Sequence, residues 1–326
     1  MSHGSTLLLI LPLLAVAPAR AQILDTPAGP VEFVGLVHRT PEAVRDALAA
    51  ARPDVPIHTT GAAQALRESL GFADAAAGTF VGFGLPEGYM TLTVVEPEEA
   101  ARVCYAEPPP DSLAPVPEWS EAYALFADAR WAWGYAVFGA ATAPNAPDET
   151  SLPAVRAFLD AHSSDADRAR ALEVLATDRD WVNRSIAAAV LSRFPDWDET
   201  WHALARAARG FEPDDRSRGL AVAALTALGQ RHARPVDWVP AAEDLRALLD
   251  GTSVFAFPQV LEVLARTRVS RELAGPLLAG GGELVLAHLA ISIPSTRARA
   301  MGVLEGLSGL DHGSDAELWR AWIETL

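Results

Sequence analysis

The amino-acid sequence predicts a small α+β domain with the order β-α-α-β-β, followed by an all-α solenoid, so that the chain is mostly helical overall. Residues 30–106 carry strand and helix signals in that order. From residue 151 onward, similar apolar helical segments recur at intervals of 34, 39 and 40 residues, which is the period of stacked helix pairs. The chain has 326 residues, half of them hydrophobic, and is long enough to bury a core in each part.

The charge balance excludes some classes of partner. The formal net charge is −16, and all 26 basic residues are arginines. A surface this acidic repels a phosphate backbone and an anionic lipid surface, so we expect no nucleic-acid partner. The single cysteine, Cys104, cannot form an internal disulfide. It lies in the strand-like run ARVCYAE, where we expect a buried, small apolar side chain.

Residues 1–21 have the pattern of a secretory signal peptide. Residues 7–16 form an apolar core, and residues 19–21 match the small-x-small rule for cleavage after Ala21. A retained membrane anchor is the alternative, but the apolar run is short for a bilayer span and contains Pro12. We therefore expect an exported protein, periplasmic or extracellular, with no stable membrane span after cleavage.

The front domain begins with a predicted strand over residues 30–36 (PVEFVGL), which are rich in β-branched and aromatic residues. Thr40 is expected to cap a helix that has Pro41 in its first turn. After two helix-breaking prolines, Thr60 is expected to cap a second helix, which ends at Gly71.

Two further strands, residues 79–84 and 89–95, are predicted on either side of a Pro-Glu-Gly turn. In the second of them, Thr91 and Thr93 alternate with apolar residues, so one face of that strand is expected to face solvent. The two helices would cover the other face of a three-stranded sheet. An added strand is one interpretation of residues 98–107 (EEAARVCYAE).

Four motifs within residues 30–106 give a resemblance to a known module. They are VEFVGL, the helix TPEAVRDAL, the joint RPDVPIHTT and the segment ALRESLGFADA. In this order they resemble a POTRA domain, the polypeptide-transport-associated module of outer-membrane assembly factors and some division proteins. The resemblance implies a periplasmic module that binds protein segments, often by pairing them along an open sheet edge. His38 and His58 lie in predicted turns, where we expect solvated polar side chains and not metal ligands.

The joint between the two parts is rich in proline. Residues 107–117 contain five prolines and are predicted to form a stiff, extended linker. A Trp-rich connecting helix is predicted over residues 118–140, and its aromatic side chains are Trp119, Tyr123, Phe126, Trp131, Trp133 and Phe138. Their spacing suits a helix face, so we expect burial between the two halves of the chain. A surface that stacks on carbohydrate is the alternative.

Residues 151–326 are predicted to form stacked helix pairs. The segments RSIAAAVLSRF, RGLAVAALTAL, FPQVLEVLART and RARAMGVLEGL can be aligned, and their matching leucines are Leu191, Leu225, Leu264 and Leu304. Partner helices are expected between them, at residues 198–209, 240–249 and 271–290. A single pair cannot bury its own apolar face, so stacking has to supply the core.

The aligned segments resemble HEAT repeats. Asp180 stands four residues before Arg184, Asp214 stands four before Arg218, and Arg297 occupies the matching place in the last segment. In HEAT repeats such Asp and Arg residues form a ladder between neighbouring units. The resemblance therefore implies a structural role for these five residues, with contact to a ligand as the weaker alternative.

The ladder of Asp and Arg residues is expected to have one gap, and the C-terminal segment is expected to close the array. In the third segment Phe257 takes the arginine position and Pro258 follows, so the ladder should stop there. Pro258 is expected to kink that helix or to lie in its first turn. The C-terminal segment resembles the closing segment of many secreted HEAT-type bacterial proteins. Its Trp319 and Trp322 are expected to cover the open end of the array.

No motif in the sequence points to a catalytic, cofactor-binding or metal site. We expect a non-enzymatic exported scaffold or adaptor, without a cofactor, that binds other proteins of the cell envelope. One alternative is a metal-binding or hydrolytic enzyme that uses Glu283, Asp311 or Asp315 with His288 or His312, although their spacing matches neither a calcium loop nor a zinc site. The other is a glycan-binding protein that uses the Trp-rich helix.

Overall fold

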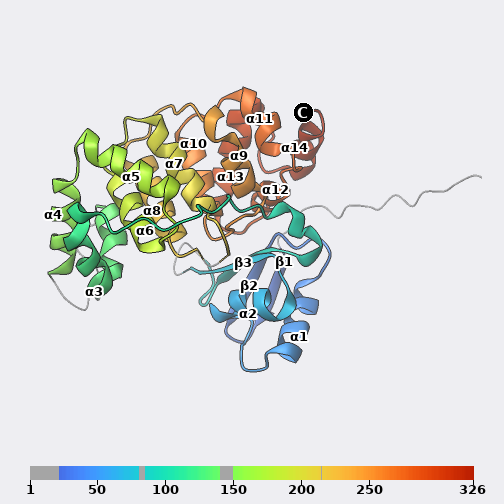
Figure 1. Cartoon of the computed structure of the whole chain (residues 1–326). Coiled ribbons are helices and arrows are strands. Elements are labelled where there is room, and N and C mark those ends of the chain that lie inside the picture. The colour runs from blue at the N-terminus through green and yellow to red at the C-terminus, as the bar shows by residue number, and fades with distance from the viewer. Residues whose placement is uncertain (1–21, 81–84, 140–149, 214) are drawn as a thin grey trace, which may run out of the picture.

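The structure, a computed structural model, describes residues 22–80, 85–139, 150–213 and 215–326. A small mixed sheet with two helices comes first and a long series of helices follows (Figure 1), which confirms the predicted fold class. The predicted signal peptide lies outside the described residues. In the described part, no helix has both the length and the apolar character that a bilayer span requires.

Among the residues that the structure describes, the N-terminal sheet has four strands, whereas three were predicted. They are β1 (Gln22–Thr26), β2 (Gly29–Val34), β3 (Asp74–Thr79) and β4 (Met90–Val95). Their order across the sheet is β1-β2-β4-β3, with a parallel central pair and two antiparallel outer pairs. The prediction omitted β1 because Leu24 is its only buried residue, so the strand shows no apolar alternation.

The strand predicted over residues 79–84 overlaps β3 only at Thr79. β3 begins five residues earlier than predicted, and residues 81–84 lie outside the described part of the chain. Three alanines and a glycine give β3 a weak intrinsic strand preference, and pairing with β4 sets its register, with Ala77 opposite Leu92. Residues 98–107 add no strand, because Pro97–Arg102 is a 3-10 helix.

Helices α1 (Pro41–Ala51) and α2 (Gly61–Leu70) cover one face of the sheet. The predicted start of α1 is confirmed, since the Thr40 side chain accepts a hydrogen bond from the backbone N–H of Ala43. The end of α2 is also confirmed, with Gly71 in the left-handed conformation at φ 71°. The predicted cap at Thr60 is wrong, because its backbone is already helical and its side chain makes no cap hydrogen bond.

The other face of the sheet packs against the helices and not against solvent. Val34, Tyr89 and Val95 belong to the same continuous apolar core as the helical array. Thr91 and Thr93 are buried on this face, which corrects the expectation that it is solvated. Apolar–polar alternation in a strand reports only that its two faces differ, so it could not reveal that a second layer covers the polar face.

The remaining helices form two rows (Figure 1). After α3 (Ser120–Val137) and α4 (Ser151–Ala161), one row contains α5 (Asp165–Thr177), α7 (Asp198–Arg209), α9 (Ala242–Asp250) and α11 (Ala274–Leu278). The second row contains α6 (Trp181–Leu191), α8 (Arg218–Arg231), α10 (Phe257–Arg266) and α13 (Pro294–Ser308). The four aligned leucines are buried, one in each helix of the second row. Helix α12 (Glu283–Leu289) contacts the sheet, and α14 (Ala316–Ile323) packs on α12.

Two details of the array follow from glycine and proline. The helix predicted over residues 271–290 is wrong as a single element: a 3-10 turn and α11 end before Gly281 and Gly282, whose φ values of 90° and 65° break the helix before α12. Pro258 lies in the first turn of α10, one of the two positions expected for it.

The proline-rich joint is extended, but it is bound along the array and does not hang free between domains. We call residues 103–116 the strap. The backbone N–H of Ala106 donates to the carbonyl of Gly210 at 2.9 Å, just after α7. The N–H of Leu113 donates to Asp178 Oδ1 at 3.1 Å, just after α5. The strap therefore runs from the sheet toward α3, past the ends of successive helices (Figure 1).

The strap also contains Cys104, whose predicted burial is wrong. Its backbone N–H donates to Thr252 Oγ1 at 2.7 Å and its carbonyl accepts from Arg209 Nε at 2.6 Å, while its thiol side is exposed. The array therefore holds this residue by its backbone and also by its sulfur, which accepts a hydrogen bond from Arg209 Nη2 at 3.0 Å.

Candidate functional site: an aromatic groove with two arginines

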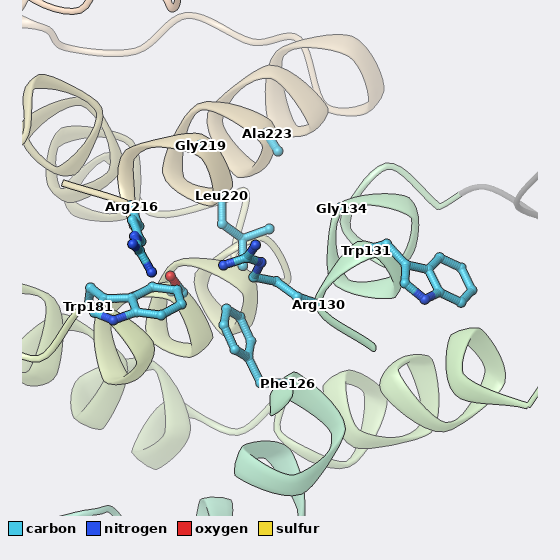
Figure 2. A pocket seen from close by; sticks show the side chains of 10 residues that line it. Phe126, Arg130, Trp131, Gly134, Trp181, Arg216, Gly219, Leu220 and Ala223 are labelled. Carbon is cyan, nitrogen blue, oxygen red and sulfur yellow. The ribbon is translucent and has the colours of Figure 1, made fainter. Parts of the chain in front are cut away.

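The most promising candidate site is a groove of about 670 Å³ where α3, α6 and α8 meet. Its lining is mostly aromatic and small apolar residues with two arginines, as Figure 2 shows, and comprises Phe126, Arg130, Trp131, Gly134, Trp181, Ser185, Arg216, Gly219, Leu220 and Ala223. An adjoining hollow of about 860 Å³ shares Phe126, Arg130, Trp131 and Trp181 with it. The two form one open surface, each part in the size range of small-ligand sites.

Trp181 occupies the centre of this surface because of the turn that precedes it. Asp180 caps α6 by accepting hydrogen bonds from the backbone N–H groups of Val182 and Asn183, at 2.8 and 2.9 Å. Trp181 is therefore the first residue of the helix, where its half-buried ring packs edge-on against Phe126 with centroids 5.6 Å apart. The cap fixes the start of the helix, and with it the position of the indole.

Helix α3 supplies one wall of the groove and changes direction within it. Ala129 has the non-helical angles φ −142° and ψ 55°, so the regular helix is interrupted between Phe126 and Arg130. Arg130 directly follows this break and reaches toward the groove beside Phe126 in Figure 2.

Both arginines of the groove lie against the same indole. The guanidinium carbon of Arg130 is 5.7 Å from the Trp181 ring centroid, and that of Arg216 is 5.5 Å from it. Contacts of this kind contribute about 0.5–1 kcal/mol each at exposed sites. Both arginines are exposed, and neither forms an ion pair with any described residue. The neighbouring carboxylate of Asp215 is already bound by Arg184 and Ser217, at 2.7 and 2.6 Å.

One polar side chain lies at the floor of the groove. Ser185 lines it from α6 and is 1% exposed. Its hydroxyl makes no hydrogen bond to a described residue, so it is available as a donor or acceptor to a bound group. One acidic residue, Asp128, lines the adjoining hollow.

The residues predicted to form a ladder have different roles. Arg184 pairs with Asp215 of the next helix pair in a buried salt bridge of 2.7 Å. Arg218 lies over the Tyr105 ring at 5.9 Å and bonds the carbonyl of Pro213. Arg297 makes no side-chain hydrogen bond or ion pair among the described residues, and Asp214 lies outside them. One rung of a ladder is therefore found, with the aspartate one position later than expected.

The acidic and histidine residues of the alternative enzyme or metal hypothesis are engaged separately. Glu283 forms an ion pair with Arg320, and Asp315 caps α14. Burial lowers the pKa of His288 to about 4, and its ring stacks on Phe257. Asp311 bonds the N–H of Gly313, and His312 packs on Trp319. Across the described ranges, no three His, Cys, Asp or Glu side chains gather in a set that could hold a metal ion.

The Trp-rich helix places most of its rings inside the protein. Trp119 and Trp133 are fully buried, while Trp131 is half-buried at the rim of the groove. In α14, Trp319 is buried and Trp322 packs against it, with the two ring centroids 5.8 Å apart. The sequence reasoning missed Trp181 and Arg216, although a tryptophan directly after a capping aspartate is a readable signal of a ring at a helix start.

Comparisons of this chain with protein-family models, with curated proteins and with solved structures find no match.

Proposed function

We propose that this protein is a non-enzymatic, exported scaffold or adaptor that binds other proteins of the cell envelope through a HEAT-like array fused to a POTRA-like domain. The observation that carries the proposal is the groove between α3, α6 and α8, an open surface with an aromatic centre and two arginines free of described ion pairs. Aromatic residues and arginine are the side chains most enriched at protein–protein contacts.

The packing of the two parts supports a scaffold role. The sheet and the array share one apolar core, and the Glu32 carboxylate on β2 bonds Ser292 between α12 and α13. A surface held on such a rigid frame loses little conformational entropy on binding. The sheet also ends in two edge strands, β1 and β3, which supports pairing of an extended segment as a second mode of binding.

Site-specific photo-crosslinking in cells that produce the protein tests this proposal. The photoreactive residue p-benzoylphenylalanine replaces Ala223, which lines the groove, and in a control variant replaces the exposed Ser295 of α13. We expect a discrete protein adduct from position 223 and none from position 295. Failure to form any protein adduct at position 223 would argue against a protein-binding groove. Fractionation of the same cells, with sequencing of the mature N-terminus, tests export and cleavage after Ala21.

A further inference from the structure

The groove differs in charge from the protein that surrounds it. The chain carries a formal net charge of −16, yet this surface presents two arginines without described ion-pair partners. Other arginines of the array have carboxylate partners, as Arg184 has Asp215 and Arg209 has Glu243 and Asp244. At physiological ionic strength charges are screened beyond roughly 8 Å. A ligand in the groove therefore experiences these two cations more strongly than it experiences carboxylates that lie beyond this screening length.

The positions of the two guanidinium groups specify more than a positive charge. Each lies within 6 Å of the centre of the Trp181 ring, at 5.7 and 5.5 Å, so an apolar surface and two cations are presented together. Figure 2 shows Arg130 and Arg216 approaching this region from different elements, α3 and the turn before α8, with Phe126 beside Arg130. Gly134, Gly219 and Ala223 leave room for a chain to pass.

We propose that this groove binds an acidic segment of another polypeptide, whose side-chain carboxylates pair with Arg130 and Arg216 while a neighbouring apolar side chain packs on Trp181 and Phe126. This inference rests on the proposed function and names the chemistry of the partner. Arginine suits the role because its planar guanidinium donates two parallel hydrogen bonds to a carboxylate. The Ser185 hydroxyl at the floor supplies a further donor.

Two other occupants fit the surface less well. A nucleic acid carries a phosphate at every nucleotide, and the acidic surface around the groove would repel the part of the polymer that extends beyond it. A neutral glycan would stack on Trp181 but would leave both guanidinium groups without a counter-charge. An acidic segment of polypeptide uses the aromatic and the cationic features together.

The test is a selection from a phage-displayed library of random dodecapeptides against the folded chain. Displayed peptides are fused at their C-terminus, so only side-chain carboxylates are offered. We expect enrichment of peptides with Asp or Glu next to an aromatic or aliphatic residue. Enrichment of sequences without acidic residues, or no enrichment, overturns the proposal. Stronger binding to a neutral glycan array or to fluorescein-labelled oligothymidylate overturns it as well.

Matched variants tie the selected peptides to the groove. In fluorescence anisotropy with a synthetic copy of an enriched peptide, Arg130→Ala and Arg216→Ala should each weaken binding about fivefold. The control Arg297→Ala, which removes an arginine from the same row of helices, should leave binding unchanged. Equal binding to the R130A/R216A double variant overturns the proposal. A cross-link from position 223 without acidic peptides from the library would leave the proposed function standing and remove only this inference. Selection of acidic peptides without a cross-link from position 223 would remove the proposed binding of envelope proteins and leave only the preference of the groove for acidic segments.

Discussion

Glu32 Oε1 accepts hydrogen bonds from both the backbone N–H and the hydroxyl of Ser292, at 2.8 and 2.9 Å, and so links β2 to a loop 260 residues later. The second carboxylate oxygen accepts from the hydroxyl of Tyr89. Burial, together with the hydrogen bond to Glu32, raises the pKa of Tyr89, so this hydroxyl stays protonated and remains a donor. A fully buried carboxylate thus has three donors at the contact between sheet and array.

Glu32→Ala should lower the free energy of unfolding by about 3 kcal/mol, because it leaves the Tyr89 hydroxyl and the Ser292 N–H buried without an acceptor. The matched variant Ser292→Ala removes only the hydroxyl and should cost about 1 kcal/mol. Urea unfolding followed by circular dichroism measures both values. Equal costs for the two variants would show that the carboxylate is not the centre of this contact.

His288 should make the protein less stable as the pH falls below neutrality. Burial is the cause that lowers its folded-state pKa to about 4, against 6.5 as the ordinary value. The unfolded chain therefore binds a proton between pH 6.5 and pH 4 that the folded chain does not. The expected loss is about 2 kcal/mol between pH 7 and pH 5, and it does not grow further below pH 4.

The comparison of wild type with His288→Leu isolates this contribution from that of other groups. Burial raises the pKa of Asp74, which acts in the opposite direction by favouring the folded chain as the pH falls. Chemical unfolding at several pH values should show that the difference between wild type and variant changes by about 2 kcal/mol between pH 7 and pH 5. A constant difference would contradict the prediction.

The Arg184–Asp215 pair should matter for stability far more than the other aligned arginines. Its side chains are 6% and 1% exposed, so Arg184→Met leaves a buried carboxylate without its cation, at a cost of about 3–5 kcal/mol. Arg297→Ala, which removes an arginine with no described side-chain partner, should change stability by less than about 0.5 kcal/mol. Thermal unfolding of the two variants measures this difference in stability. Similar melting temperatures for the two would contradict the prediction.

The two tryptophans of α14 should also differ in how much each contributes to stability. Trp319 is fully buried and donates from Nε1 to the carbonyl of Gly313 at 2.9 Å, so Trp319→Ala should cost about 3–5 kcal/mol. Trp322 is half-buried against it, and Trp322→Ala should cost about 1 kcal/mol. Limited proteolysis should release the C-terminal helix from the first variant before the second. Release at equal rates would mean that neither ring closes the end of the array.

Much of the fold was predictable because its signals are local. Thr40 with Pro41 marks a helix start, and the spacing of the aligned leucines marks the second row of helices. The register of β3 could not be predicted from the sequence. An alanine-rich strand takes its position from the strand with which it pairs, as Ala77 does opposite Leu92.

The groove could not be predicted from the sequence for a related reason. Phe126, Trp181 and Arg216 lie on three segments that touch only once the array has stacked. The number of tryptophans favours the segment 118–140, whose Trp119 and Trp133 are internal, over Trp181, a single ring at a helix start. The expected ladder used Asp214, whereas Arg184 meets Asp215, because spacing in the sequence does not determine which carboxylate an arginine reaches in the folded chain.

The strap has a mechanical consequence. In a stack of helix pairs, small rotations at each interface add up to a large change in curvature. A proline-rich segment that is already extended cannot lengthen, and the bonds from Ala106 and Leu113 anchor this one at separate points of the stack. The strap therefore opposes any change in the curvature of the array, and a partner meets a surface whose width was set when the chain folded.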